Sequence, residues 1–423
     1  MQNKCKRISA IVSVSVMLTL IMSISAASIF KLAQYYIDDV EYNNAVSTDG
    51  NRFENDVATT FAFKDEFIDL NGGMRNLYGA REMNGVVKLD NGTLLTPYRE
   101  VSDEVLRKDA DNVIALKKYL EDRGTAFVYG ITPYNSSKYD PQLPVGYNDY
   151  GNSNFDKFAQ MLREGGVDVI DFRETMHDEG IDQYDMMYKT DHHWNTEAGF
   201  YAYTKISDYL EKALGCTVDP VVRDINNYTM VNYPRTHLGS RGKRVGKLFA
   251  GIDDFHIYWP NFETSISRGK TAGTFESLIV DMSAIENPDL MKKSTYDVTL
   301  GNSRSAYSND LAKNDTKLLV MADSFASVVD PYLILSYSEV RCQKLGLTAK
   351  TIEEYDPDAV VMFYYATCFI EDGYFDFDLP VESLDLPKID VSLENNGTQA
   401  VIKWDSVDNA KEYKVYTFLG DEC

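Results

Sequence analysis

Cysteine is scarce in this sequence, and its positions exclude two common kinds of site. Five cysteines are present: Cys5, Cys216, Cys342, Cys368 and Cys423. They form no CxxC pair and show no zinc-ligand spacing. Cys5 precedes a long apolar run and Cys423 is the last residue. We therefore expect the other three to be small buried apolar residues rather than a disulfide framework.

Basic residues are also in deficit. The chain holds 42 Lys and Arg against 65 Asp and Glu, which gives a net charge of -23. Such a charge argues against nucleic acid or an anionic membrane surface as a partner. It does not identify a substrate, because an acidic surface is usually just a solvated one. A length of 423 residues favours a main domain with an accessory piece.

Residues 1–30 predict a signal peptide or an N-terminal membrane anchor. Lys4, Lys6 and Arg7 form a basic start, and an apolar run follows from Ile8 to Phe30. The small residues Ser25-Ala26-Ala27 offer a cleavage site, and the run is also long enough to span a bilayer. The basic end should stay cytoplasmic, so the rest of the chain is expected outside. We predict an exported protein, anchored or secreted, at a bacterial cell surface.

Residues 31–385 predict an α/β domain with a parallel sheet and helices on both faces. Two short entry helices with aromatic inner faces are expected in 53–79, followed by a hairpin over 85–95 with an Asn-Gly turn. Helical and buried-strand patterns then alternate. The expected helices are 101–122, 154–164 and 198–210, and the expected strands are 125–131, 167–172, 317–326, 338–344 and 359–365. Ligands bind at the carboxyl ends of such strands, so the loops after 125–131 and 167–172 should border the site.

Two segments break this alternation. Residues 212–314 are polar and Gly-rich, which predicts an insertion of short strands and loops that could roof a cleft. Residues 388–423 alternate with period two and predict β-strands. There Trp404 and Tyr413 resemble core positions of a fibronectin type III domain. About three strands cannot close such a sandwich, so this module looks truncated.

The densest group of polar and aromatic residues is Asp191-His192-His193-Trp194. Asn195 or Thr196 can cap the helix that follows, so the group lies on a loop entering a helix. Polar side chains on such a loop are held rigidly and can still reach a ligand. A capped turn with a Trp packed beneath it is the structural alternative.

Ser324 gives this group a chemical partner. It ends the apolar run Met321-Ala322-Asp323-Ser324, where a strand-to-helix turn would expose the hydroxyl and its own backbone N–H could help hold an oxyanion. A serine needs a base to take its proton, and His193 can supply one. Asp191 can hold the His193 ring in the correct tautomer. A strand-end cap is the structural alternative for Ser324.

Together, Asp191-His192-His193-Trp194 and Ala322-Asp323-Ser324-Phe325 resemble the DHHW family. This family is related to the alginate acetylation proteins AlgJ and AlgX and has a permuted SGNH-hydrolase-like fold. The resemblance runs from about residue 50 to 375. It implies Ser324 as nucleophile, His193 as base and Asp191 as orienting acid, with His192, Trp194 and Asp323 in support. No cofactor and no metal ion is implied.

The sequence departs from SGNH hydrolases at the oxyanion hole. Their Gly and Asn blocks are not evident, and the strand 359–365 continues as Tyr364-Tyr365-Ala366-Thr367. The second oxyanion donor therefore stays unassigned. Weaker candidates for substrate binding are Lys138, Tyr134, Arg241 and Tyr365. Arg241 belongs to a group of cations, with Arg235, Lys243, Arg244 and Lys247, that could meet an anionic ligand.

Three functions remain open. The resemblance favours an exported acyl-transfer enzyme, an O-acetyltransferase or acetylesterase, that acts on a cell-surface polysaccharide and receives acyl groups from a membrane-bound O-acyltransferase. A non-catalytic cell-wall or carbohydrate-binding protein is the first alternative. The second is a metal-dependent phosphoesterase, since Asp-His-His also marks such enzymes, but they require further Asp and His ligands that the sequence does not offer convincingly.

Overall fold

The computed structural model describes residues 2–43, 50–286, 289–299, 305–380, 391–395 and 400–406. The chain divides into two compact units, Met1–Asp378 and Leu379–Cys423. Each unit is described by itself.

The N-terminal apolar run forms one long helix, α1 (Gln2–Asn43). Its segment Ile8–Ile37 is long and apolar enough to cross a membrane, and it lies near the N-terminus as a signal sequence would. The later part of α1 contacts α2 (Gly50–Thr60). There the hydroxyl of Tyr36 donates to Asp56 at 2.9 Å.

The entry region contains α2, α3 (Lys64–Leu77) and a small antiparallel sheet. That sheet is formed by β1 (Glu82–Met83), β2 (Val86–Lys88) and β3 (Leu94–Leu95). The predicted hairpin is confirmed, since β2 pairs with β3 across a turn in which Gly92 has φ +88°. The predicted aromatic inner faces are wrong, because Phe53, Phe61, Phe63 and Phe67 are all at least 40% exposed. The inner face of α3 instead carries Asp69 and Gly72.

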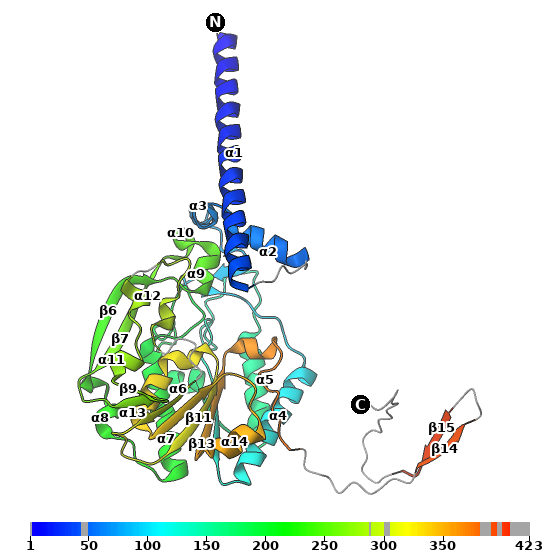
Figure 1. The fold of residues 1–423 in the computed structure, drawn as a ribbon, viewed down its shortest axis with the longest axis vertical. Helices are drawn as coiled ribbons and strands as arrows, with labels where there is room; N and C mark the ends of the chain where they lie inside the picture. Colours follow the sequence, from blue (N-terminus) through cyan, green and yellow to red (C-terminus); the bar gives the residue numbers. More distant parts are fainter. Residues whose placement is uncertain are drawn as a thin grey trace. The chain divides into compact units, whose positions relative to one another are not determined.

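The main sheet has the order β5-β4-β13-β11-β12-β10-β8-β9 (Figure 1). Its first five members are parallel and match the five predicted strands. They are β4 (Ala126–Ile131), β5 (Asp168–Asp171), β11 (Lys317–Ala322), β12 (Glu339–Gln343) and β13 (Ala359–Tyr364). Every residue of β13 is buried, as a continuous apolar run in a central strand requires. β5 was predicted to be buried, but it is a half-exposed edge strand because only β4 flanks it.

Helices cover both faces of this sheet, with α4 and α5 packed together on one face and α7 and α13 on the other (Figure 1). Their bounds are α4 (Asp103–Glu121), α5 (Gly151–Glu164), α6 (Phe172–Asp178), α7 (Thr196–Leu214), α13 (Asp330–Ser336) and α14 (Ala349–Tyr355). In α4, Ser102 caps the first turn, and the buried residues recur every three or four positions from Leu106 to Leu120. This spacing is what an amphipathic helix on a sheet needs.

The stretch 212–314, expected as an insertion, contributes to the main sheet. β8 (Ile266–Arg268), β9 (Thr271–Gly273) and β10 (Ala306–Asn309) extend it by antiparallel pairing from β12. β6 (Tyr228–His237) and β7 (Asp253–Pro260) form a separate two-stranded ribbon. The shorter elements are α8 (Pro220–Arg223), η1 (Ile225–Asn227), α9 (Ser240–Val245), α10 (Lys247–Ala250), α11 (Phe275–Leu278), α12 (Ser283–Glu286) and η2 (Thr295–Val298).

The C-terminal unit is described only as a hairpin of β14 (Val391–Asn395) and β15 (Ala400–Trp404). Two of the predicted strands are thus confirmed. The strand expected at 412–416, with Tyr413, lies outside the described residues. One hairpin does not show a fibronectin type III fold, which needs two packed sheets.

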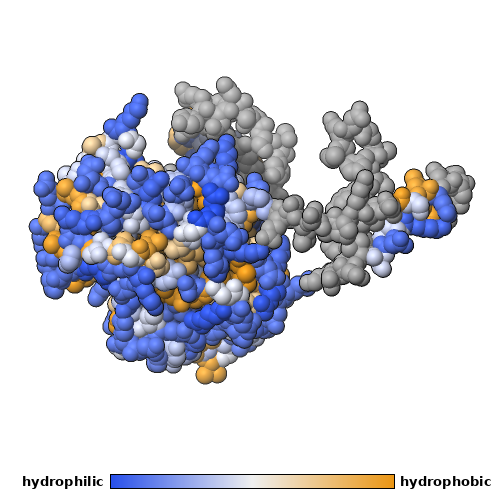
Figure 2. Space-filling model, turned by 90° about the horizontal axis from the view of Figure 1, so that it is seen from below, coloured by the Kyte–Doolittle hydropathy of each residue, from blue (hydrophilic) through white to orange (hydrophobic). Residues whose placement is uncertain are grey.

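Figure 2 shows the molecule from below, so that it presents the face opposite the end at which α1 projects in Figure 1. This face is mostly hydrophilic, with small apolar areas between the polar side chains. Such a surface is typical of a soluble domain.

Candidate active site

The Asp191 loop is closed at its base by short backbone bonds. Met187 and Trp194 form an isolated antiparallel bridge, and the Tyr188 N–H donates to the His193 carbonyl at 3.2 Å. Asn195 then caps α7, because its side-chain oxygen accepts from the Ala198 N–H at 3.0 Å. The predicted cap is confirmed. The loop therefore presents its side chains from a fixed frame.

Ser324 follows β11 directly, at the carboxyl end of the parallel sheet. It begins the short 3-10 helix η3 (Ser324–Val328). Asp323 fixes this turn, because one carboxylate oxygen accepts from the Phe325 N–H at 3.0 Å and the other from the Tyr365 N–H at 2.8 Å. Asp323 thus ties the end of β11 to the end of β13.

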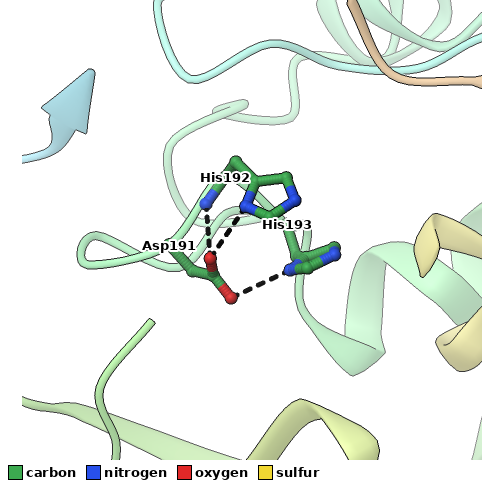
Figure 3. Close-up of side chains that lie close together, drawn as sticks. All are labelled: Asp191, His192 and His193. Atoms are coloured by element: carbon green, nitrogen blue, oxygen red, sulfur yellow. Dashed lines mark hydrogen bonds and ion pairs between the residues drawn. The ribbon is translucent and has the colours of Figure 1, made fainter. Parts of the chain in front are cut away.

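The fold brings Ser324, His193 and Asp191 into one hydrogen-bonded chain. His193 Nε2 lies 2.6 Å from Ser324 Oγ, although 131 positions separate the two residues in sequence. On the other side of the ring, His193 Nδ1 lies 2.9 Å from Asp191 Oδ2 (Figure 3). This is the nucleophile, base and orienting-acid geometry of serine acyl-transfer enzymes.

The Asp191 carboxylate is held from several directions. Its Oδ1 accepts from the His192 N–H at 2.8 Å, and His192 Nδ1 lies 3.0 Å away (Figure 3). The same oxygen accepts from the Ser240 N–H at 3.0 Å and from the Ser240 hydroxyl at 2.9 Å. Gly239 allows this approach, since a Cβ there would lie 2.1 Å from the Cβ of Asp191. The carboxylate therefore has one available orientation.

His237 is a third imidazole at the same carboxylate. Its Nε2 lies 3.2 Å from Asp191 Oδ2, and its side chain is fully buried. Within the described part of the chain, neither ring nitrogen of His237 makes a hydrogen bond. The ring packs on Tyr188 with centroids 4.4 Å apart.

Burial and neighbouring charges set the protonation states. Burial, reinforced by the adjacent His192, lowers the pKa of His193 to about 4 against the attraction of Asp191. Burial would raise the pKa of Asp191, but the His193 and His192 rings and their hydrogen bonds hold it well below its usual range. At neutral pH, His193 is therefore neutral and able to take a proton, and Asp191 is ionised.

Aromatic rings fix the position of His193. Tyr296 stacks on its ring at 3.9 Å with an interplanar angle of 15°. Trp194 is fully buried, and its indole N–H donates to the Phe325 carbonyl at 2.9 Å. Trp194 thus links the histidine loop to the serine turn.

The four residues predicted for substrate binding lie in different surroundings. Lys138 forms ion pairs with Asp156 at 3.0 Å and Glu174 at 3.2 Å, so its charge is already balanced. Tyr134 is fully buried and donates to Asp149 at 2.7 Å. A role of Lys138 and Tyr134 in substrate binding therefore stays a prediction.

Arg241 and Tyr365 lie behind the Asp191 loop. Arg241 is buried and donates to the carbonyls of Leu94 at 3.1 Å and Asp191 at 3.2 Å, and to the Tyr365 hydroxyl at 2.8 Å. The Tyr365 ring stacks on Phe325 at 4.9 Å. Of the other predicted cations, Arg244 lies beside Arg241, because both donate to the Thr96 hydroxyl, at 3.3 and 3.4 Å. Lys247 instead pairs with Asp69 at 3.0 Å, and Lys243 donates to the Lys293 carbonyl at 2.9 Å.

Sequence reasoning missed His237, Ser240 and Tyr296, all within the stretch expected as an insertion. The sequence His237-Leu238-Gly239-Ser240 could have been singled out as part of the site, because histidine is rare in this chain. The loop after β4 borders the site as expected, because the Asn135 amide donates to the Asp191 carbonyl at 2.7 Å. The other predicted border, after β5, contributes Phe172, whose ring lies edge-on to Trp194.

Asp191, His192 and His193 also place three potential metal-ligand atoms within 4.8 Å of one another. The donor set suits a metal poorly, because both Asp191 oxygens already face N–H or O–H donors. A two-metal phosphoesterase site needs further carboxylate and imidazole ligands. Among the described residues this is the single such group.

Comparison with known proteins finds a matching family model and similar folds. Residues 95–220 match the family described as the SGNH hydrolase-like domain of the acetyltransferase AlgX. No curated protein sequence matches the chain.

Three solved structures share the fold. Bacillus cereus PatB1 is 21% identical, with a TM-score of 0.57 over 69% of this chain and 99% of its own. PatB1 with a sulfonyl adduct is 19% identical, with a TM-score of 0.56 over 70% and 98%. A DHHW family protein from Eubacterium siraeum is 17% identical, with a TM-score of 0.52 over 69% and 94%. The predicted resemblance is confirmed: this chain is related, through residues 95–220, to the SGNH hydrolase-like acetyltransferase AlgX, and it shares the fold of PatB1 and the DHHW family protein.

Proposed function

We propose that this chain is an exported, serine-dependent acyl-transfer enzyme that moves or removes O-acetyl groups on a cell-surface polysaccharide. The observation that carries the proposal is the continuous contact from Asp191 through His193 to Ser324 at 2.9 and 2.6 Å. A serine that merely caps a strand end needs neither a buried neutral imidazole at its hydroxyl nor an ionised carboxylate behind that imidazole.

The first half-reaction acylates Ser324. His193 Nε2 takes the hydroxyl proton as Ser324 Oγ bonds to the acetyl carbonyl carbon of the donor. The backbone N–H of Ser324 lies at the start of η3 and supports the oxyanion that forms. The carbon–oxygen bond to the donor then breaks, and His193 returns the proton to the departing alcohol. Asp191 keeps the ring oriented and stabilises its transient positive charge.

The second half-reaction releases the acyl group. A sugar hydroxyl gives its proton to His193 and attacks the acetyl carbonyl, which restores Ser324 and leaves an acetylated sugar. Water in place of the sugar makes the same site an acetylesterase. A polysaccharide acceptor is supported by the match to the acetyltransferase AlgX family. The N-terminal helix, able to act as signal or anchor, supports an exported site, where a membrane-bound O-acyltransferase would supply the acyl group.

An ester assay tests the proposal. The full-length chain in detergent is incubated with a chromogenic acetyl ester, beside Ser324→Ala and His193→Ala. We expect each variant to lose at least about 10³-fold in kcat. Ser153→Ala is the matched control, because Ser153 Oγ donates to the nearby Tyr150 carbonyl at the start of α5, and it should keep full activity.

Two additions separate the alternatives. A sulfonyl fluoride should label Ser324 and stop turnover, since its sulfur accepts the serine oxygen and releases fluoride. A chelator should leave turnover unchanged. Turnover that is lost when chelator is added but kept in Ser324→Ala would instead favour a metal-dependent enzyme. Failure to hydrolyse or transfer acetyl from any ester or acetylated glycan would favour a binding protein.

A further inference from the structure

Helix α3 presents its apolar side outward. Phe63, at its N-cap, is followed by Phe67, Leu70, Met74 and Leu77 at intervals of four, three, four and three, which places them along one face. These five side chains are between 44% and 87% exposed. We refer to them as the α3 stripe.

The opposite face of α3 is the one packed on the domain, and its contacts are polar as well as apolar. Ile68 packs against the buried cluster that contains Val245 and Phe249. Asp69 accepts from the Lys247 N–H at 2.6 Å and forms an ion pair with its ammonium at 3.0 Å. Gly72 lies against α9 and α10, where a Cβ would stand 2.2 Å from the Val245 carbonyl oxygen. The helix is therefore fixed by apolar, polar and close backbone contacts on this face, and these contacts turn the α3 stripe away from the core.

Neighbouring residues enlarge the stripe into a patch. Phe61 lies beside Phe67 with ring centroids 6.2 Å apart, and it is 40% exposed. Leu248 of α10 packs against Gly73 and is itself exposed. A contiguous apolar surface of this kind marks a site of contact with another apolar phase.

The position of this patch along helix α1 indicates that the apolar phase is lipid. The uncharged run of α1 lies between Arg7 and Lys31, and at 1.5 Å per residue it is about 34 Å long, close to the hydrocarbon thickness of a bilayer. Ser28, near the outer end of this run, accepts a hydrogen bond from the Ala62 N–H at 3.1 Å. Ala62 directly precedes Phe63, so the start of the α3 stripe lies at the level where the run leaves the bilayer.

We propose that the α3 stripe is a membrane-docking surface that inserts into the outer leaflet beside α1 and holds the domain against the bilayer. The occupant is lipid, because the patch is continuous with the candidate span and α2, α3 and α10 lie at the end of the domain where α1 projects (Figure 1). The opposite side, in Figure 2, is mostly hydrophilic. Aromatic and aliphatic side chains on one face of a helix are what interfacial helices use.

Photolabelling tests this surface. The full-length chain is reconstituted into phosphatidylcholine vesicles that contain a lipid with a diazirine in its acyl chain, then irradiated and mapped by mass spectrometry. We expect label in α1 and in the 63–78 peptide. Neutral lipid should suffice, since the stripe is apolar.

Substitutions sharpen the test. Phe67→Asp, Leu70→Asp and Met74→Asp combined should lower the label in 63–78 at least about five-fold, with α1 labelling unchanged. The three side chains are exposed, so the melting temperature in detergent should stay within a few degrees. Val221→Asp with Met230→Asp, also at exposed apolar positions, should leave the label in 63–78 unchanged.

Three outcomes would overturn the proposal. Label in α1 without label in 63–78 would mean that the stripe faces water. Protection of 63–78 from hydrogen exchange without lipid label would mean that a protein or a second copy covers it. Label in neither segment would remove the anchor on which the argument rests. The measurement involves no acetyl transfer, so its result is independent of the proposed catalytic function.

Discussion

His237 Nε2 lies 3.2 Å from Asp191 Oδ2, the same oxygen that faces His193 Nδ1 at 2.9 Å. Asp191 Oδ2 thus contacts two imidazoles, one directed at Ser324 and one buried behind it, while His192 contacts the other carboxylate oxygen. His237 touches no reacting atom, so we interpret it as a positioning residue for the Asp191 carboxylate.

Replacing His237 should lower the rate without impairing substrate binding. We expect His237→Phe to keep the packing on Tyr188 and to lose about ten-fold in kcat, which corresponds to about 1.4 kcal/mol of transition-state stabilisation. KM should stay within about two-fold. His256→Phe is the control, since His256 lies on β7 and makes no side-chain contact with Asp191 in the described structure. A wild-type kcat in His237→Phe would show that the third imidazole has no part in positioning.

The pH dependence of catalysis should follow His193. Burial and the adjacent His192 lower the pKa of His193 to about 4, and the proposed mechanism needs the neutral ring. Because a lowered pKa keeps the ring neutral in more acidic solution, kcat/KM should persist below pH 6.5, the ordinary pKa of histidine. His192→Gln should raise the pH at which kcat/KM falls on the acid side, because it removes the neighbouring charge that lowers the pKa of His193. An acid limb at or above pH 6.5 in the wild type would contradict this assignment.

Arg241 should contribute to stability through its planar shape. Its guanidinium donates to the Leu94 and Asp191 carbonyls and to the Tyr365 hydroxyl, and a lysine cannot present this fork. We expect Arg241→Lys to lower the free energy of unfolding by about 1–3 kcal/mol, measured by urea denaturation. The exposed Arg235, changed to Lys, should alter stability by less than about 0.5 kcal/mol. Equal effects at both positions would refute the role of the fork.

The sequence predicted which residues lie together at the site better than it predicted their surroundings. Asp191, His193 and Ser324, which form one hydrogen-bonded chain, could be singled out because few residue types can act as nucleophile, base and acid and because both motifs lie at the ends of helices or strands. His237, Ser240 and Tyr296 were not, because long-range packing of the 212–314 stretch brings them to Asp191. The five parallel strands were readable as apolar runs, whereas β8–β10 are too short to show a period. The aromatic faces of α2 and α3 were predicted to face the core because regularly spaced apolar residues usually do. The sequence pattern does not distinguish a face that packs on the core from one that would contact lipid.

Asp330 should make stability depend on pH. Its carboxyl is buried, and burial raises its pKa to about 7. The folded state therefore holds this proton more tightly than the unfolded chain. The stabilisation that the protonated carboxyl gives to the folded state is complete below about pH 3.8 and is lost as pH rises through about 7.

The variant Asp330→Asn should abolish this dependence. Between pH 5 and pH 8 we expect it to gain stability relative to wild type, on the order of 2 kcal/mol, in thermal melts at both pH values. Asp315→Asn, at an exposed loop position, should show no such gain. An Asp330→Asn protein that is less stable at pH 8 than wild type would mean that the ionised carboxylate has a stabilising partner.

The most direct test of the account is to trap the acyl-enzyme. The full-length protein is mixed with an acetyl ester, quenched in acid within the first turnovers and analysed by intact and peptide mass spectrometry. The account predicts one acetyl group on Ser324, absent from Ser324→Ala and depleted in His193→Ala. Turnover with the acetyl group on another residue, or turnover that persists in Ser324→Ala, would contradict it.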